Sequence, residues 1–246
     1  MPKLFNNATN KHGLIVYGGE SSADYGMVVS EAPAYERPVR KQTVFTVPGR
    51  NGAVIFQDDA WEDVVRSYNV WLANGHDSLD VKVNAFEAML NSMKGYQRLE
   101  DNFEPDVFRL AYYSGGDDFS NNMTQYGEAT ITFTCRPERF FKSGESVIEI
   151  VNGSKLVNST RFTAKPLIHI EGTGTVTVQI GGNTISAAVT DYINIDCETM
   201  NAYRLAAENK NSDISGSFPK INPGENSIGI TGTTTLVTVV PRYFTI

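Results

Sequence analysis

The order of apolar and polar positions differs between the two halves of the chain. The first half mixes short alternating segments with one stretch of helical period, whereas the second half is a series of alternating segments separated by glycine-rich breaks. Alternation over four to eight residues, rich in Thr, Val, Ile and aromatic residues, is typical of half-buried β-strands. The pattern therefore predicts a mainly β protein with one helix and a regular β-sandwich in the second half.

The single helical period lies in the first half. Phe86, Met89, Leu90 and Met93 follow the spacing i, i+3, i+4, i+7, and Gly95 stands where a helix commonly ends. This predicts a helix near 81–94. Its apolar stripe is expected to pack against a sheet rather than to bind a cofactor.

A β-hairpin is predicted upstream of the helix. Gln42–Val47 and Ala53–Phe56 have strand composition, and the Pro-Gly and Asn-Gly dipeptides between them mark tight reversals. Asp58 and Asp59 predict another turn after the second strand. The exposed tip of this hairpin is the candidate contact site, with an ordinary surface hairpin as the alternative: Pro48, Gly49, Arg50, Asn51 and Gly52.

A domain boundary is predicted near the middle of the chain. Ala129–Cys135 alternates as a strand, which Pro137 is expected to end at Arg136, because proline has no N–H and restricts the residue before it. The expected domains are 1–141 and 146–246. The candidate hinge between them consists of Arg136, Pro137, Arg139, Phe140 and Phe141.

The second domain is predicted to contain eight short strands. Gly172-Thr173-Gly174 and Gly181-Gly182-Asn183 are expected to be turns between them. The predicted strands are Val147–Val151, Pro166–Ile170, Thr175–Ile180, Thr184–Val189, Tyr192–Asp196, Asn201–Leu205, Ser227–Ile230 and Leu236–Val240.

Composition narrows the class of protein. The chain has 246 residues, 41% of them hydrophobic and 20% charged, which are values of a globular protein. A net charge of −7 argues against a broad nucleic-acid-binding surface. No segment is long and apolar enough to predict export or membrane spanning. Cys135 and Cys197 lie in alternating segments, so buried free thiols are expected rather than a disulfide.

The sequence contains no known catalytic or metal-binding motif. Three histidines are scattered, and we expect no catalytic residue, no cofactor and no metal. Asp196 and Glu198 share strand parity, so they are the candidate pair for glycoside hydrolysis or calcium binding. Solvation of two exposed carboxylates is the ordinary interpretation. Asn209, Asn211 and Asp213 imitate the start of an EF-hand loop, although Ile214 occupies its glycine position.

Several segments, in this order, carry a resemblance that covers nearly the whole chain. The chain resembles the distal tail proteins of long-tailed phages that infect Gram-positive bacteria. The segments are Arg37–Gly52 (RPVRKQTVFTVPGRNG), Arg98–Gly115 (RLEDNFEPDVFRLAYYSG), Ile131–Glu145 (ITFTCRPERFFKSGE), Phe162–Gly174 (FTAKPLIHIEGTG), Tyr192–Thr199 (YINIDCET), Phe218–Ile228 (FPKINPGENSI) and the C-terminal VVPRYFTI.

The resemblance implies a structural protein of the virion, made in the host cytoplasm and located at the tail tip. Proteins of this family form a homo-hexameric ring, single or stacked, through an N-terminal domain with a β-sandwich-like sheet and a helix. That ring docks the tail tube protein on one side and a tail-associated lysin or baseplate hub on the other. DNA would only pass through its lumen, and no membrane is involved.

The resemblance also implies a galectin-like β-sandwich as the C-terminal domain, which in some members carries a receptor-binding protein. The alternative function is a carbohydrate-binding module that recognises host cell-wall sugars through this domain. A third hypothesis is a glycoside hydrolase that uses Asp196 and Glu198.

Overall fold

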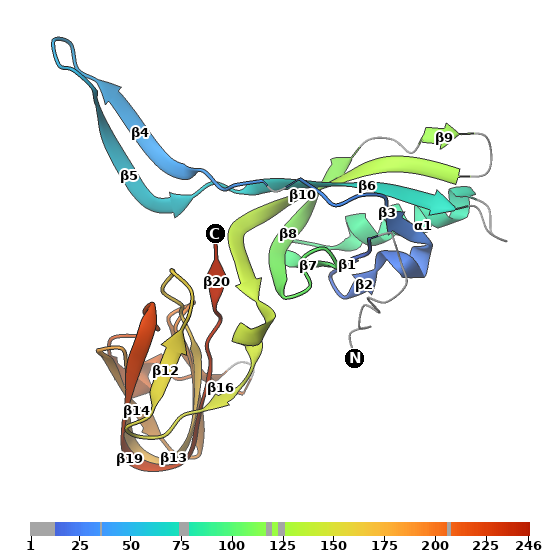
Figure 1. Cartoon of the computed structure of the whole chain (residues 1–246). Helices are drawn as coiled ribbons and strands as arrows, with labels where there is room; N and C mark the ends of the chain where they lie inside the picture. Colours follow the sequence, from blue (N-terminus) through green and yellow to red (C-terminus); the bar gives the residue numbers. More distant parts are fainter. Residues whose placement is uncertain (1–12, 35, 74–78, 117–119, 123–125, 206–207) are drawn as a thin grey trace. The chain divides into compact units, whose positions relative to one another are not determined.

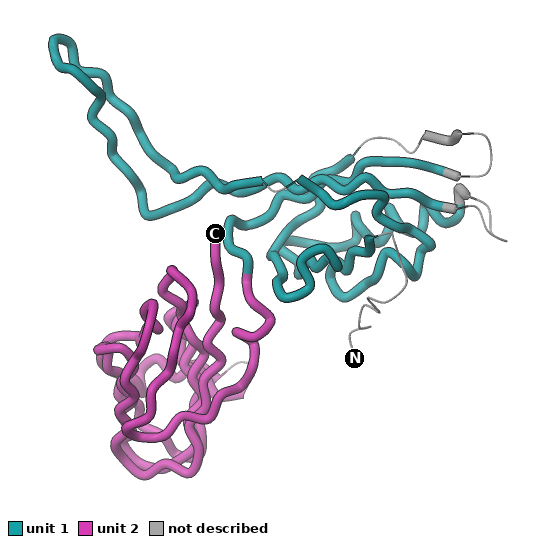
Figure 2. Tube along the Cα trace, in the orientation of Figure 1, with its two compact units in different colours: residues 1–139, 246 teal, residues 140–245 magenta. Residues whose placement is uncertain are grey.

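The computed structural model describes residues 13–34, 36–73, 79–116, 120–122, 126–205 and 208–246. The chain divides into two compact units, Met1–Arg139 with Ile246 (unit 1) and Phe140–Thr245 (unit 2), which Figure 2 shows in different colours. Both units are built mostly from β-strands, and the described residues contain one α-helix. The predicted fold class, mainly β with one helix, is confirmed.

Unit 1 contains a sheet with the strand order β2-β1-β7-β8-β10-β6-β3, to which β9 adds beside β10, and a separate two-stranded ribbon of β4 and β5 (Figure 1). In chain order its elements are β1 (Ile15–Tyr17), β2 (Glu20–Ser21), the 3-10 helix η1 (Ser22–Tyr25), β3 (Met27–Val29), β4 (Arg40–Thr46), β5 (Ala53–Trp61), β6 (Val64–Ala73), α1 (Leu79–Ser92), β7 (Gln97–Asp101), β8 (Val107–Gly116), β9 (Ser120–Asn122) and β10 (Tyr126–Phe141).

The core of unit 1 lies between α1 and one face of the sheet. Phe86, Met89 and Leu90 are buried in the same cluster as the inward side chains of the strands, and Met93 packs against it. Phe133 of β10 lies at the centre of that cluster, with its ring 4.9 Å from that of Tyr17. The predicted helix and its packing stripe are therefore confirmed, although α1 begins and ends two residues earlier than predicted. Gly95 follows it with φ 67°.

Unit 2 contains a sheet with the strand order β11-β19-β13-β15-β16-β17, to which β12 adds beside β19, β14 beside β13, and β18 beside β14. After the last residues of β10, its elements are η2 (Lys142–Glu145), β11 (Ile148–Glu149), β12 (Lys155–Asn158), β13 (Leu167–Ile180), β14 (Asn183–Val189), β15 (Tyr192–Asp196), β16 (Asn201–Arg204), β17 (Glu208–Asn209), η3 (Asn211–Asp213), β18 (Ile214–Gly216), β19 (Gly224–Val240) and β20 (Phe244–Thr245).

Two long strands connect the two layers of unit 2. The first part of β13 pairs with β15, its second part pairs with β14, and β19 follows β13 along both parts. Their register shifts at Glu171/Gly172 and between Thr173 and Thr177, where Gly174 has φ 81°. The prediction of a turn at Gly172-Thr173-Gly174 was wrong, because the glycines form bulges that bend one strand instead of reversing it. Likewise, Ser227–Ile230 and Leu236–Val240 belong to one strand.

Two other predicted interruptions are also absent. β10 continues through Pro137 to Phe141, because its pairing with β6 ends at Cys135 opposite Val64, and the missing N–H of Pro137 removes no bond from that ladder. Asp58 and Asp59 lie within β5 rather than in a turn. They fall at an irregularity after which pairing resumes with Trp61 opposite Arg40.

Candidate assembly surfaces

The ribbon of β4 and β5, which we call the arm (Arg40–Trp61), forms a two-stranded sheet of its own. Its predicted hairpin is confirmed, with Thr46 opposite Ala53 next to the tip and Thr43 opposite Phe56 further along. In Figure 1 the arm is a separate ribbon from the sheet that contains β6. Since an isolated two-stranded hairpin is marginally stable in water, its environment decides whether it is ordered.

The register of the arm gives it two apolar faces. Val44 lies opposite Ile55 on one face, and Phe45 lies opposite Val54 on the other, next to Phe56. The first pair, the aliphatic face, is 53% and 54% exposed, and Phe45 and Phe56 on the phenylalanine face are 52% and 61% exposed. The two Phe rings meet edge to face at 5.6 Å. Large apolar side chains are thus exposed on both sides of one ribbon.

The five predicted contact residues all lie at the exposed tip of the arm. The Arg50 N–H donates to the Val47 carbonyl at 3.2 Å, and Gly49 has φ 78°. Proline followed by a glycine with positive φ is the arrangement of a type II turn. A Cβ at Gly49 or Gly52 would meet no atom within 4 Å. The tip therefore has free space around it in the single chain.

The base of the arm is fixed by local contacts. The Arg40 guanidinium lies 4.6 Å from the centre of the Trp61 ring, and the Glu62 N–H donates to the Val39 carbonyl at 2.9 Å. Between Gln42 and Gln57 the only charged residue is Arg50. The charged side chains of the arm are thus found at its base and its tip, while the middle is uncharged.

A second exposed surface is the face of the unit 1 sheet opposite α1, which we call the outer sheet face. The inward positions of β10, such as Ile131 and Phe133, are buried, so Thr130, Thr132 and Thr134 point to the other side. The centre of this face along β10 is uncharged and partly apolar, with Glu128 before it and Arg136 after it on the same side of the strand. It consists of Thr130, Thr132 and Thr134 with Val65 (46% exposed), Tyr96 (45%) and Tyr112 (38%).

The candidate hinge residues lie on both sides of the unit boundary. Within unit 1, the Arg136 guanidinium is 5.6 Å from the Tyr96 ring centre, and Arg139 Nη1 donates to Glu104 Oε1 at 3.0 Å. Within unit 2, the Phe140 ring is 6.1 Å from that of Phe244, and the Phe141 N–H donates to the Tyr243 carbonyl. Pro137 lies in β10 between the two arginines. The boundary therefore falls between two neighbouring residues, each with contacts in its own unit.

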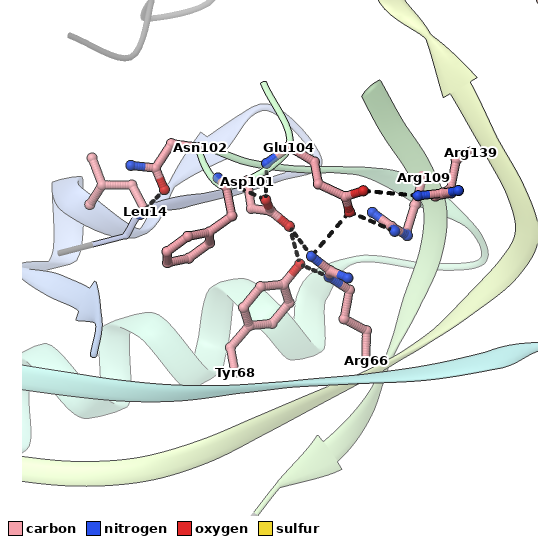
Figure 3. Close-up of polar contacts among 9 residues, drawn as sticks. Leu14, Arg66, Tyr68, Asp101, Asn102, Glu104, Arg109 and Arg139 are labelled. Atoms are coloured by element: carbon pink, nitrogen blue, oxygen red, sulfur yellow. Dashed lines mark hydrogen bonds and ion pairs between the residues drawn. The ribbon is translucent and has the colours of Figure 1, made fainter. Parts of the chain in front are cut away.

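A buried ionic network, which the sequence reasoning missed, connects to Arg139 through Glu104 (Figure 3). Arg66 and Asp101 are 4% and 3% exposed, and Arg66 Nη2 lies 2.8 Å from Asp101 Oδ2. The Tyr68 hydroxyl donates to the same oxygen at 2.8 Å. Burial, reinforced by the Asp101 carboxylate, raises the pKa of Tyr68 well above its ordinary value, so its hydroxyl stays a donor. Arg66 lies two residues before the buried Tyr68 in β6, so its side chain points to the same side of the sheet. A charged residue at this inward position was the feature of the sequence that could have predicted the network.

Glu104 completes this network. Its Oε2 lies 2.7 Å from Arg109 Nη2 and 3.3 Å from Arg66 Nη2, as ion pairs rather than aligned hydrogen bonds, and its Oε1 accepts from Arg139 (Figure 3). Three strands of the sheet, β6, β8 and β10, thereby share one carboxylate. Because a buried charge is costly unless it is paired, these strands are held in one arrangement.

The carboxylates considered for hydrolysis have structural partners instead. Asp196 accepts two hydrogen bonds from Arg242, at 2.7 and 3.1 Å, and the backbone N–H groups of Glu198 and Thr199. Burial acts to raise the pKa of Asp196, but these donors outweigh it and lower the pKa below its ordinary value. A general acid needs the opposite shift. Glu198 lies 3.8 Å from Lys165.

The EF-hand-like segment is also occupied by internal contacts. Asn211 Oδ1 accepts the Ala202 N–H, and Asn209 Oδ1 accepts the Asn211 N–H. In the part of the chain that the structure describes, no group of His, Cys, Asp and Glu side chains could hold a metal ion, and no helix could span a membrane. Cys135 and Cys197 are free and buried, which confirms that prediction.

Comparison with known proteins identifies the fold. No protein-family model and no curated protein matches the sequence. Among solved structures, the chain is similar to Dit (gp 19.1) of phage SPP1, described as a hub of the adsorption apparatus of phages that infect Gram-positive bacteria. The TM-score is 0.74 at 12% identity, with 95% of this chain and 99% of that chain covered. A chain of the phage p2 baseplate, in its activated conformation with Sr, is similar with a TM-score of 0.51 at 11% identity, with 93% and 97% covered. The chain thus has a Dit-like fold.

Proposed function

We propose that this protein is a structural hub of the tail tip of a long-tailed phage. It forms a hexameric ring that joins the tail tube to a tail-associated lysin or a receptor-binding apparatus. The observation that carries the proposal is a likeness to a phage hub protein that extends over nearly the full length of both chains. A likeness that covers both units is informative because a single sandwich could belong to many functions.

In this proposal, unit 1 forms the ring and the arm makes the contact between neighbours. The support is physical: the arm exposes large apolar side chains and has no covering layer within the described part of its own chain. Exposed apolar patches of this kind mark sites of protein association. The candidate tip residues, from Pro48 to Gly52, would lie at the far end of that contact.

Unit 2 would face outward and carry the receptor-binding partner, with Arg136, Pro137, Arg139, Phe140 and Phe141 setting its angle to the ring. The support is that Arg139 and Phe140 are adjacent and each contacts its own unit. Replacement of both Phe140 and Phe141 by Ala would test this role. We expect a wider range of domain angles in electron micrographs, and an unchanged range would mean that the segment is only a tether.

The most direct test of the hub is the mass of the purified protein in solution combined with negative-stain images. We expect a six-fold ring, either alone or after addition of the tail tube protein of the same phage. A protein that stays monomeric at high concentration, with and without that partner, would contradict the proposal.

The second candidate function is carbohydrate binding through unit 2, and one observation favours it. On the face of unit 2 opposite its core, the His169 ring lies 5.5 Å from the Tyr192 ring, and His169 Nδ1 lies 2.8 Å from Asn194 Oδ1. Aromatic rings beside planar polar groups suit sugar binding. Retention of the full chain on host cell walls, lost in Tyr192→Ala, would support this function, whereas no retention on any wall would reject it.

A further inference from the structure

We infer that the arm is buried on both of its faces, between two other copies of this chain, rather than lying on one neighbour with its second face in water. This inference rests on the proposed ring and specifies how the arm takes part in it. It follows from the distribution of apolar side chains over the two faces of the ribbon.

Strands that are covered on one side show a clear alternation, and unit 2 provides the example. In β13, Ile168 and Ile170 are fully buried, while His169 between them and Glu171 after them are partly exposed polar residues. Such alternation is the pattern of a sheet with one covered face. The outer side of β13 can therefore remain in water.

The arm lacks this alternation. Val44 and Phe45 are consecutive in β4, as are Val54, Ile55 and Phe56 in β5, so apolar residues fall on both faces. The exposed fractions of the two faces are nearly equal, at 53% and 54% for Val44 and Ile55 against 52% and 61% for Phe45 and Phe56. Runs of consecutive apolar residues are typical of strands buried on both sides. One neighbour under one face would leave the other pair in water.

The distribution of charge favours other copies of this chain as the molecules that cover the arm. The middle of the arm is uncharged, and so is the centre of the outer sheet face along β10, from Thr130 to Thr134 between Glu128 and Arg136. The arm does not cover the sheet of its own chain, since β4 and β5 pair only with each other and their large apolar side chains stay exposed. Each copy therefore offers an apolar ribbon and a sheet surface with an uncharged centre, which a second copy can cover. Head-to-tail contacts of this kind close into a ring when the rotation between neighbours divides a full turn.

The test uses two variants of the full chain, each of which removes one apolar face. Val44→Thr with Ile55→Thr changes the aliphatic face, and Phe45→Thr with Phe56→Thr changes the phenylalanine face; threonine keeps strand propensity. The matched control is Val157→Thr, an equally exposed valine (57%) on a strand of unit 2. Association is followed by analytical ultracentrifugation over a concentration series, and circular dichroism of the dilute protomer checks that each variant folds.

We expect each face variant to raise the concentration needed for assembly by about tenfold or more, and the control to stay within about twofold of the parent protein. If one face variant assembles like the parent protein while the other does not, the arm is covered on one face only and the inference is overturned. If the parent protein does not assemble at any concentration, with or without the tail tube protein, the proposed ring fails and this inference fails with it. The behaviour of the parent protein therefore distinguishes the two failures.

A second measurement does not depend on how strongly each variant weakens assembly. Ile55→Cys and Phe56→Cys place single thiols on opposite faces of the arm, while the native Cys135 and Cys197 are buried. In the dilute protomer both new thiols should react with a maleimide. In the assembled protein both should be protected by about tenfold or more. One protected and one reactive thiol in that assembly would show that only one face is covered by copies of this chain.

Discussion

The arm and the β13–β19 pair are both long antiparallel ribbons rich in apolar residues, but they differ in whether those residues are buried within the single chain. β13 and β19 bury one side in the core of unit 2, where Ile168, Ile170 and Val239 are fully buried. In the arm, no large apolar side chain is fully buried in the single chain. The difference shows that the sandwich buries its large apolar side chains within one chain, whereas the arm leaves its own exposed there.

The largest effect is expected inside unit 1, in the ionic network rather than in the arm. Asp101→Ala leaves the buried Arg66 without its closest carboxylate, and breaking a buried ion pair from one side costs about 3–5 kcal/mol. We expect the free energy of unfolding, measured in urea by circular dichroism, to fall by this amount. Asp59→Ala in the arm is the control, since Asp59 is fully exposed. Equal losses in both variants would remove the distinction between the two regions.

A matched pair of isoleucines compares the sandwich and the arm directly. Ile170→Ala removes a fully buried side chain and should cost about 2–5 kcal/mol in the unfolding of unit 2. Ile55→Ala should change the stability of the dilute protomer by less than about 0.5 kcal/mol, because Ile55 is 54% exposed. A large loss for Ile55→Ala at a concentration where the protein is monomeric would mean that the arm contributes to the fold of its own chain.

A smaller effect is expected at acidic pH, from Asp196. Its pKa is below the ordinary value of an aspartate in the folded protein, so the unfolded chain binds a proton at a higher pH than the folded one does. The ion pair with Arg242 therefore stabilises unit 2 above the ordinary pKa, near 4, and this contribution is lost as pH falls through the folded-state pKa. We expect Asp196→Asn to cost about 1–3 kcal/mol at pH 7 and much less near pH 2.

The thermal midpoint measured across this pH range tests the role of Asp196. Asp59→Asn, at an exposed position of the arm, is the control and should follow the parent protein at every pH. A constant difference between Asp196→Asn and the parent protein down to pH 2 would exclude the ion pair as its cause.

The smallest effect concerns the native thiols. Burial raises the pKa of Cys135 to about 11 and that of Cys197 to about 12, so both thiols are protonated at pH 8 and shielded from reagents. We expect neither to react with a disulfide reagent in the folded protein, and both to react in denaturant. Rapid reaction of either in the native state would show that its unit opens more readily than its packing implies.

The sequence was sufficient for elements whose pattern is local. The spacing of Phe86, Met89 and Leu90 predicted α1 and its buried stripe, and the dipeptides Pro48-Gly49 and Asn51-Gly52 predicted the hairpin. Both follow from backbone geometry that neighbouring residues determine. The full-length resemblance likewise predicted a fold that the structural comparison confirms.

Features that depend on distant partners were predicted less well. Gly172-Thr173-Gly174 suits a turn and a bulge equally, and only the pairing of β13 with β19 along its whole length decides for the bulge. Pro137 ends a strand only where its N–H is needed, which depends on where β6 stops. The consecutive residues Val44 and Phe45 were visible in the sequence. Their exposure was not, because the same run could have belonged to a core strand.

The bends of β13 and β19 determine how unit 2 should respond to force and heat. Because each of these strands passes through both layers, neither layer can lose its hydrogen bonds without breaking strands on which the other depends. The sandwich is therefore expected to open in a single cooperative step, with similarly slow amide hydrogen exchange in both layers. Such cooperativity keeps unit 2 folded until the applied force exceeds what the whole sandwich can resist.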